Sequence, residues 1–294
     1  MTVTLHVNMT RKNAFNVALD VCAQLKKLNV NVLMSDDLKQ YFSDCTDNVS
    51  FIGIEQSVAL CDVLIAIGGD GTIIHSSHYA VKYDKPILGI NAGRLGFLAG
   101  LEKQELELLH NLISGNYTID KRMMLCVKHY ENGEFVDEYT CLNDLIIAHG
   151  DSLRLCEIEA YSEGRLVNTY LADGLIAATP TGSTAYSLSA GGPVVDTSIE
   201  SIILTPVCSH SLFARSMIFR PDTVIHFRVK NPDISHAVFS CDGEKGIPMS
   251  ESSSLIVTKS DKKVRILRIK SDSFTDILSH KLIERYRHNK EESL

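Results

Sequence analysis

The sequence predicts an α/β N-terminal domain with a mostly parallel sheet, followed by a β-rich C-terminal domain. In the first hundred residues, short apolar runs alternate with helix-length segments, which is the rhythm of βαβ units and indicates a parallel sheet. After about residue 100, many short strand-like runs separated by turn formers replace this rhythm. The 294 residues also exceed the usual size of one domain, roughly 100 to 200 residues, so we expect two domains.

We expect the α/β domain over residues 1–100 and the β-rich domain over residues 101–270, with residues 271–294 packing back on the first domain. The apolar run 63–67 is typical of a strand buried on both faces. The first domain is expected to contain strands at 3–7, 30–34, 63–67 and 87–90, and helices at 14–28 and 72–81. The rest is expected to contain a helix at 104–113, strands at 124–129, 141–148, 155–161, 175–178, 199–204, 223–229, 237–240, 254–258 and 263–269, and a terminal helix at 274–287.

Composition limits the partners of this chain. Hydrophobic residues make up 45% of the sequence and charged residues 22%, which is ordinary for a folded globular protein. A formal charge of −7 argues against broad binding to nucleic acid or an anionic membrane, but not against small anions held by backbone N–H groups. The scattered cysteines and the lack of a signal peptide or membrane span predict a soluble, cytoplasmic protein.

The most informative stretch is a glycine-rich turn that follows the buried strand 63–67. Gly68, Gly69 and Gly71 remove Cβ atoms, so backbone N–H groups can approach a phosphate, and the helix that follows adds a favourable potential. Thr72 is expected to cap that helix. Asp70 has two interpretations: it orients an attacking hydroxyl in phosphoryl transfer, or it merely caps the helix or bonds its own turn.

This turn matches neither of the common nucleotide fingerprints. It lacks the Lys-Ser/Thr pair of a Walker loop, and its glycines do not have the strict Gly-x-Gly-x-x-Gly spacing. A phosphate site of a different kind is therefore expected.

A second cluster follows the predicted strand 175–178. Five hydroxyls fall within the nine residues 181–189, and Tyr186 adds a face on which a base can stack. Such a segment can hydrogen-bond a sugar and a base, although a Ser/Thr-rich turn that enters a helix would look similar. Asn143 and Asp144 offer amide donors beside a carboxylate, but an ordinary turn also explains this pair.

Taken together, these motifs resemble the NAD kinase family (ATP-NAD or polyphosphate-NAD kinases) over nearly the whole chain. The Gly-Gly-Asp-Gly turn alone also occurs in lipid kinases and, in part, in phosphofructokinases. The resemblance becomes specific because the turn is followed in order by Asn91 to Leu98, by Asn143-Asp144, and by Asp173-Gly174 leading into Thr179 to Pro193.

The resemblance implies that Asp70 orients or deprotonates the 2′-hydroxyl of the adenosine ribose of NAD, and that Gly68, Gly69 and Gly71 face phosphate. Asn143 and Asp144 would hold the NAD adenine or ribose, although the family commonly has Glu where this chain has Asp144. The other implied nucleotide-binding residues are Thr72, His75, Arg154, Asp173, Thr181, Thr184, Ala185, Tyr186, Ser187, Leu188, Ser189, Asp242 and Glu244.

Simpler explanations stay open for several of these residues. His75 could be a polar residue on an exposed helix face, and Asp242 and Glu244 could belong to a plain turn between strands. Asn91 and Arg94 could serve only the shape of a tight turn.

The resemblance also implies that ATP or polyphosphate donates the phosphoryl group, that a divalent cation, expected to be Mg²⁺, accompanies the donor, and that the protein is a homodimer or homotetramer. We assign no metal ligand in the chain. Two rival functions are a lipid kinase, which the polar segment 181–189 disfavours, and a non-catalytic sensor that binds a dinucleotide.

Overall fold

The computed structural model describes residues 1–42, 48–93, 96–150, 154–211, 214–231 and 236–280. The chain forms two compact units, Met1–Lys121 with Val264–Leu294, and Arg122–Lys263. The first is α/β with a mostly parallel sheet and the second is β-rich, as the sequence predicts. No helix of the described residues combines the length and apolar character that crossing a membrane requires.

The unit boundaries lie at residues 121 and 264 instead of the expected 100 and 271. Leu101, Leu106, Leu109 and Leu112 are buried in the core of the first unit, so the chain leaves this unit later than the change in texture suggests. Ile266 pairs with Ile87, which places the return of the chain before the terminal helix.

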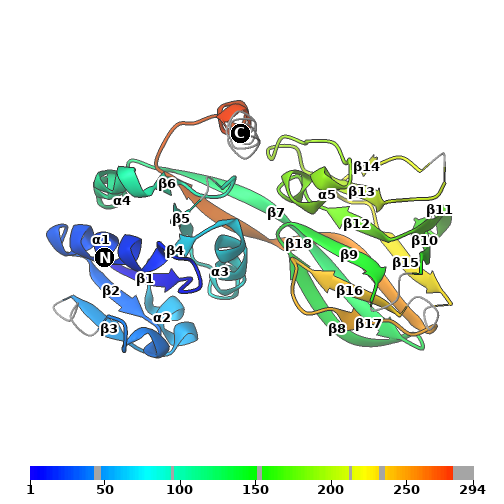
Figure 1. The fold of residues 1–294 in the computed structure, drawn as a ribbon, viewed down its shortest axis with the longest axis horizontal. Helices are drawn as coiled ribbons and strands as arrows, with labels where there is room; N and C mark the ends of the chain where they lie inside the picture. Colours follow the sequence, from blue (N-terminus) through cyan, green and yellow to red (C-terminus); the bar gives the residue numbers. More distant parts are fainter. Residues whose placement is uncertain (43–47, 94–95, 151–153, 212–213, 232–235, 281–294) are drawn as a thin grey trace, which may run out of the picture. The chain divides into compact units, whose positions relative to one another are not determined.

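Five parallel strands build the sheet of the first unit, in the order β3-β2-β1-β4-β5 (Figure 1). The order reverses between β1 and β4, the kind of position where open α/β sheets bind ligands beyond the carboxyl ends of their strands. The strands are β1 (Thr2–Val7), β2 (Asn31–Met34), β3 (Val49–Phe51), β4 (Val63–Gly68) and β5 (Ile87–Asn91), with the two-residue β6 (Leu101–Glu102) beside β5.

Helices cover both faces of this sheet. Helix α1 (Ala14–Lys27) packs against the 3₁₀ segment η2 (Lys103–Leu109), whereas α2 (Ile54–Leu60) and α3 (Asp70–Lys82) contact each other. This arrangement is the one that right-handed crossovers require. The first helix buries Val17, Val21 and Leu25 at helical spacing and places Lys26 and Lys27 in its last turn, where the helix dipole favours cations. The elements are α1 (Ala14–Lys27), η1 (Asp36–Leu38), α2 (Ile54–Leu60), α3 (Asp70–Lys82), η2 (Lys103–Leu109) and α4 (His110–Ser114).

The second unit contains antiparallel strands. One sheet has the order β14-β13-β12-β9-β16-β17, and β7 with β8, and β11-β10-β15 with β18, complete the unit. The bounds are β7 (Thr118–Glu131), β8 (Glu134–Cys141), β9 (Asp144–His149), β10 (Cys156–Ser162), β11 (Arg165–Ala172), β12 (Gly174–Ala178), η3 (Gly182–Thr184), α5 (Tyr186–Ser189), β13 (Ile202–Val207), β14 (Met217–Phe219), β15 (Ile225–Lys230), β16 (Ala237–Cys241), β17 (Ile247–Pro248) and β18 (Ser253–Arg268).

Several elements differ from the sequence-based expectation. The expected strands 254–258 and 263–269 are one strand, β18, because the polar residues between them stay extended and paired instead of turning. The expected strand 141–148 is interrupted at residues 142–143, and the helix 104–113 is a 3₁₀ segment followed by α4. Residues 274–280 of the terminal helix are helical, and residues 281–287 lie outside the described part.

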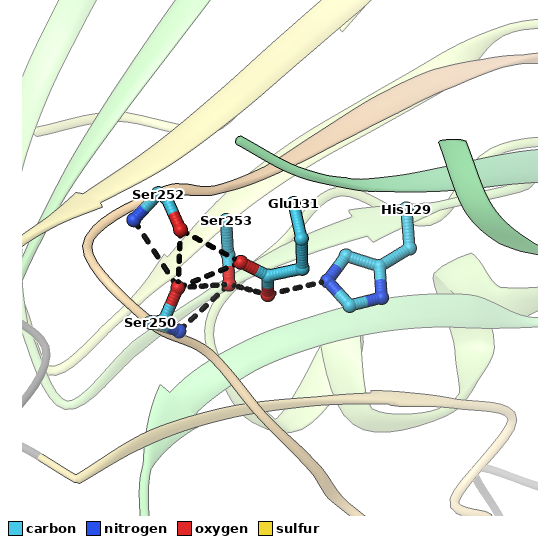
Figure 2. Close-up of polar contacts among 5 residues, drawn as sticks. All are labelled: His129, Glu131, Ser250, Ser252 and Ser253. Carbon is cyan, nitrogen blue, oxygen red and sulfur yellow. Dashed lines mark hydrogen bonds and ion pairs between the residues drawn. The ribbon is translucent and has the colours of Figure 1, made fainter. Parts of the chain in front are cut away.

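A polar cluster ties the end of β7 to the turn before β18 (Figure 2). Glu131 accepts hydrogen bonds from the hydroxyls of Ser250, Ser252 and Ser253, and its Oε1 lies 3.1 Å from Nε2 of His129. Burial by itself raises the pKa of Glu131, but bonds from Ser253, Ser250, Ser252 and His129 outweigh burial and lower the pKa from 4.5 to about 2. The ionised carboxylate therefore stabilises the folded state.

We predict that Glu131→Gln lowers the free energy of unfolding at pH 7 by about 1–3 kcal/mol, because charge-assisted hydrogen bonds are lost. The folded-state pKa is depressed, so this contribution is complete above about pH 4.5 and disappears as the pH falls toward 2. Urea unfolding should show a gap between wild type and variant that closes over this range. Glu134→Gln, at an exposed position of β8, is the control. A gap that does not change with pH would contradict the account.

Candidate active site

The glycine turn joins β4 to α3 within the first unit. The strand is buried along its whole length and ends at Gly68, and the helix begins at Asp70 with Gly69 as its N-cap. Thr72 is therefore not the N-cap that the sequence suggests. It is a buried residue of the first helical turn, and its Oγ1 accepts a hydrogen bond of 3.0 Å from Nδ2 of Asn8, in the loop after β1.

The Asp70 carboxylate bonds a segment that lies outside its own turn. Its Oδ2 accepts the N–H of Phe97 at 2.8 Å, and its Oδ1 accepts the N–H of Leu98 at 3.1 Å. Asp70 thus fixes the segment after β5 to the start of α3. Each carboxylate oxygen has two lone-pair directions and can accept more than one hydrogen bond.

The glycines in and near the turn differ in how much space surrounds them. A Cβ on Gly68 would overlap the side chain of Thr72, and a Cβ on Gly96 would overlap the Asp70 carboxylate. At Gly69 and Gly71 a Cβ would meet, among the described residues and beyond the adjoining backbone, no atom within 4 Å, and neither residue has the positive φ that favours glycine. No contact within the described part of the chain requires glycine at these two positions, and the space beside them is open to a group from outside the chain.

In the second unit, a carboxylate organises the loop that contains Asn143. Asp242, directly after β16, accepts the backbone N–H groups of Leu142, Asn143 and Asp144 at 2.7, 2.7 and 3.1 Å. Its own N–H donates to the carbonyl of Asp144 at 2.9 Å. Asp242, which we expected near a ligand, therefore positions the neighbouring pair. Glu244 is exposed and belongs to a tight turn, closed by its N–H to the Cys241 carbonyl.

Asp144 is the most perturbed carboxyl group of this loop. Its side chain is buried, and burial followed by the nearby charge of Asp242 raises its pKa from 3.8 to about 7. Near neutral pH the group is divided between a carboxylate and a neutral acid that can donate a hydrogen bond. The residue predicted as an acceptor is thus also able to act as a donor. Asn143 beside it is half-buried.

The hydroxyl-rich segment packs against the same loop. The N–H of Thr179 donates to the carbonyl of Asn143 at 2.8 Å, and a Cβ on Gly182 would overlap that carbonyl. Thr181 accepts a hydrogen bond of 3.2 Å from the buried guanidinium of Arg122. Arg122 is not among the residues predicted for the site, although a basic residue at the border of the apolar run Met123 to Val127 was a usable signal.

Most hydroxyls of the segment are used inside the protein. Thr184 donates to the carbonyl of Thr181 at 3.2 Å, and Ser187 pairs with the hydroxyl of Thr205 at 3.0 Å. Ser183 donates to Pro180 at 2.6 Å. These side chains are buried and shape the turn. The parts that reach solvent are the Tyr186 ring, which is 47% exposed, the exposed Ser189, and the half-buried Ala185 and Leu188.

Asp173 and Arg154 lie away from this loop. Asp173 precedes β12 and Thr179 follows it, and six residues of extended strand span about 20 Å. Cys156 pairs with Ala172, so Arg154 and Asp173 are at the same end of neighbouring strands. Within one chain, the structure therefore brings Asp144, Asp242 and Thr181 together, and it places Asp173 and Arg154 near the opposite end of β12.

The remaining predicted residues belong to the first unit. His75 is exposed on α3, with its ring 5.4 Å from that of His6. Asn91 donates from Nδ2 to Glu102 at 2.8 Å and accepts the N–H of Gly93 at 3.0 Å, so it shapes the turn after β5. Arg94 lies outside the described residues.

Family models match most of this chain. The model of the ATP-NAD kinase N-terminal domain matches residues 3–117, and that of the ATP-NAD kinase C-terminal domain matches residues 142–269. The NAD kinase of Caldanaerobacter subterraneus subsp. tengcongensis is 38% identical over 280 residues, which cover 92% of this chain and 97% of that protein. The NAD kinase of Desulforamulus reducens is 33% identical over 284 residues, covering 96% and 97%.

Solved structures share the fold. Yeast NADH kinase complexed with NADH superposes with a TM-score of 0.81 at 24% identity, covering 94% of this chain and 84% of that one. An NAD kinase from Archaeoglobus fulgidus in complex with ATP has a TM-score of 0.70 at 21% identity, covering 95% and 98%. At these identities the likeness concerns the fold alone.

We predict that Asp144→Asn stabilises the protein at pH 8 by up to about 4 kcal/mol and changes little at pH 4. The folded-state pKa of Asp144 is raised, so stability is lost as the pH rises from about 4 to about 7, and the neutral amide escapes this loss. Urea unfolding at the two pH values measures the effect. Asp137→Asn, at an exposed position of β8, should show no comparable pH-dependent gain. Equal effects of Asp144→Asn at both pH values would show that the carboxyl group titrates normally.

Proposed function

This chain belongs to the NAD kinase family, and we propose that Asp70 orients the 2′-hydroxyl of the adenosine ribose of NAD and takes its proton while the phosphoryl group of ATP is transferred. The chain is a phosphotransferase with an alcohol acceptor, as members of this family are. The observation that carries the proposal is the glycine turn, where Gly69 and Gly71 leave open space on either side of Asp70.

The geometry of the first unit supports this role for Asp70. Its carboxylate is held by two backbone N–H groups, so it is fixed in direction before a substrate arrives. A fixed acceptor aligns the weakly acidic hydroxyl without a cost in ordering the side chain, and positioning is the main contribution of the protein in phosphoryl transfer. The open positions at Gly69 and Gly71, with the N-terminus of α3, would receive the donor phosphates.

In the second unit we propose that Asn143, Asp144 and Tyr186 hold the dinucleotide. The Asp242 carboxylate accepts the N–H of Asn143, and the N–H of Thr179 donates to the Asn143 carbonyl, so the backbone of the loop is fixed and the two polar side chains are presented in a constant direction. The exposed ring of Tyr186 offers a face for a base. Thr181, Thr184 and Ser187 contribute through the shape of their turn.

A homo-oligomer would account for the two predicted residues that lie elsewhere. Asp173 is at the opposite end of β12 from Thr179 and Asn143, and Arg154 is at the same end as Asp173, so in our proposal they serve the dinucleotide site of a second copy in a homodimer or homotetramer. We also propose the cytoplasm as the compartment, in keeping with the free thiols of Cys61, Cys126, Cys141, Cys208 and Cys241.

A divalent cation is the remaining expected component. The described residues contain no group of three or more His, Cys, Asp or Glu side chains that could hold a metal. Mg²⁺ commonly enters such sites on substrate phosphates, with only one or two protein carboxylates. A cation that comes with the donor fits this chain, and it would offset negative charge on the phosphates.

The direct test of the proposed activity is to incubate the protein with Mg²⁺, a donor and an acceptor. Formation of NADP from NAD and ATP is the expected result, and replacing ATP by polyphosphate defines the donor. Phosphorylation of a diacylglycerol or a sphingoid base in place of NAD would contradict the acceptor, and NAD binding without turnover by any donor would identify a sensor.

We predict that Asp70→Asn lowers kcat for NADP formation about 10²- to 10⁴-fold, which is the usual effect of losing a positioned general base. The amide keeps one acceptor oxygen for the segment after β5, so NAD affinity should change less than about threefold. Steady-state kinetics and NAD titration separate the two effects. A kcat within twofold of wild type would remove Asp70 from the chemistry.

We predict that Gly71→Ala lowers kcat/KM for ATP at least about tenfold while the melting temperature is kept or raised. Alanine favours a helix over glycine by about 0.5–1 kcal/mol, and its methyl group meets no protein atom within 4 Å. The loss would come from the space taken from the donor phosphates. Gly53→Ala, at the N-cap of α2 and equally open, is the matched control with normal activity. Normal activity in Gly71→Ala would show that this space is not used.

A further inference from the structure

Three aromatic side chains gather beside the glycine turn in the first unit. The rings of His6 and His75 are 5.4 Å apart, those of His75 and Tyr79 are 5.6 Å apart, and His6 meets Tyr79 edge to face at 5.9 Å. His6 comes from β1, and His75 and Tyr79 lie one helical turn apart on α3. The ring of His75 is exposed, which is unusual for an aromatic contact that serves the core alone.

Hydrogen bonds connect this aromatic cluster to the turn. Nδ1 of His6 lies 2.6 Å from the hydroxyl of Ser76, and that hydroxyl donates to the carbonyl of Thr72 at 2.7 Å. Asn8, two residues after His6, donates to the hydroxyl of Thr72. His75 follows Asp70 by five residues, about 7.5 Å along the helix axis. The cluster is therefore within the reach of a nucleotide whose phosphates lie at the turn.

The hydrogen bonds also assign the proton on His6. Because Ser76 gives its proton to Thr72, Nδ1 of His6 must carry the hydrogen that bonds Ser76, and Nε2 then has the lone pair. Burial and the neighbouring His75 lower the pKa of His6 to about 4, although Asp37 opposes them, so the ring is neutral at pH 7. His6 thus provides a fixed hydrogen-bond acceptor beside an exposed ring.

We propose that His6, His75 and Tyr79 bind the purine ring of the phosphoryl donor, with the base stacked on His75 and its amino group donating to Nε2 of His6. This inference rests on the proposed function. The residues proposed for the dinucleotide are in the second unit, whereas the donor phosphates are assigned to the glycine turn of the first. This aromatic cluster lies in the same unit as the turn and offers a contact surface to a base attached to those phosphates.

The chemistry of the cluster favours adenine over guanine. Adenine carries an amino group at position 6, which can donate to a histidine lone pair, whereas guanine has a carbonyl oxygen there that would face it. Polyphosphate has no base and would leave the cluster unused. The cluster therefore makes ATP a better ligand than GTP or inorganic tripolyphosphate.

Titration calorimetry with the Mg²⁺ complexes of ATP, GTP and tripolyphosphate, and with NAD, tests the inference. Stacking on an aromatic side chain is worth about 1–3 kcal/mol per base, so His75→Ala should weaken ATP binding about tenfold or more. Tripolyphosphate and NAD affinities should change less than threefold. His75→Phe keeps a ring and should retain most of the ATP affinity, and His110→Ala, another exposed histidine of the first unit, should bind like wild type.

The proposal would be overturned if His75→Ala lost equal affinity for ATP and tripolyphosphate, if it lost affinity only for NAD, or if its affinity for ATP did not change. A His75→Phe variant as weak as His75→Ala would also overturn it. These outcomes are distinct from failure of the proposed function, in which the wild-type protein forms no NADP. If the wild-type protein forms NADP but the variants show any of these binding patterns, the proposed function stands and the proposed purine site is wrong.

Discussion

The hydrogen bonds from Phe97 and Leu98 to the Asp70 carboxylate are the contact on which the organisation of the first unit depends. They tie the segment after β5 to the helix that begins after β4, so the ends of two neighbouring strands form one structure. This contact requires Gly96, because any Cβ there would overlap the carboxylate, and Gly68 is needed beside it to make room for Thr72. An Asp at the start of a helix also suits the helix dipole. The same side chain is thereby held in place at the start of the helix.

The second unit uses a carboxylate in a similar way. Asp242 gathers three consecutive N–H groups of the loop 142–144, and this loop in turn supports the turn that starts at Thr179. The consequence is electrostatic, because a buried Asp144 beside Asp242 retains its proton up to about pH 7. The loop combines rigid backbone with a carboxyl group that can accept or donate a proton near neutral pH.

The sequence predicted what depends on local pattern. The strand 63–67 is apolar throughout and α1 has a clear helical period, so both were found with nearly correct ends. Elements without such a signal were missed, including the three-residue β3 and the exposed strand β8. The turn with Asp70 and the pair Asn143-Asp144 could be recognised from residue types. That Asp242 bonds the loop 142–144, about a hundred residues away in the chain, could not be predicted, because pairing over such separations depends on the whole fold.

The central claim is that this protein moves a phosphoryl group from ATP to the 2′-hydroxyl of NAD. The position of the new phosphate is the most direct measurement. ³¹P NMR of the product formed from NAD and ATP, supported by transfer of a γ-labelled phosphate, distinguishes a 2′-monoester from every other product. The account predicts a single labelled phosphate at the 2′ position of the adenosine ribose. A label at the 3′ position, on the nicotinamide ribose, or only in inorganic phosphate would contradict it.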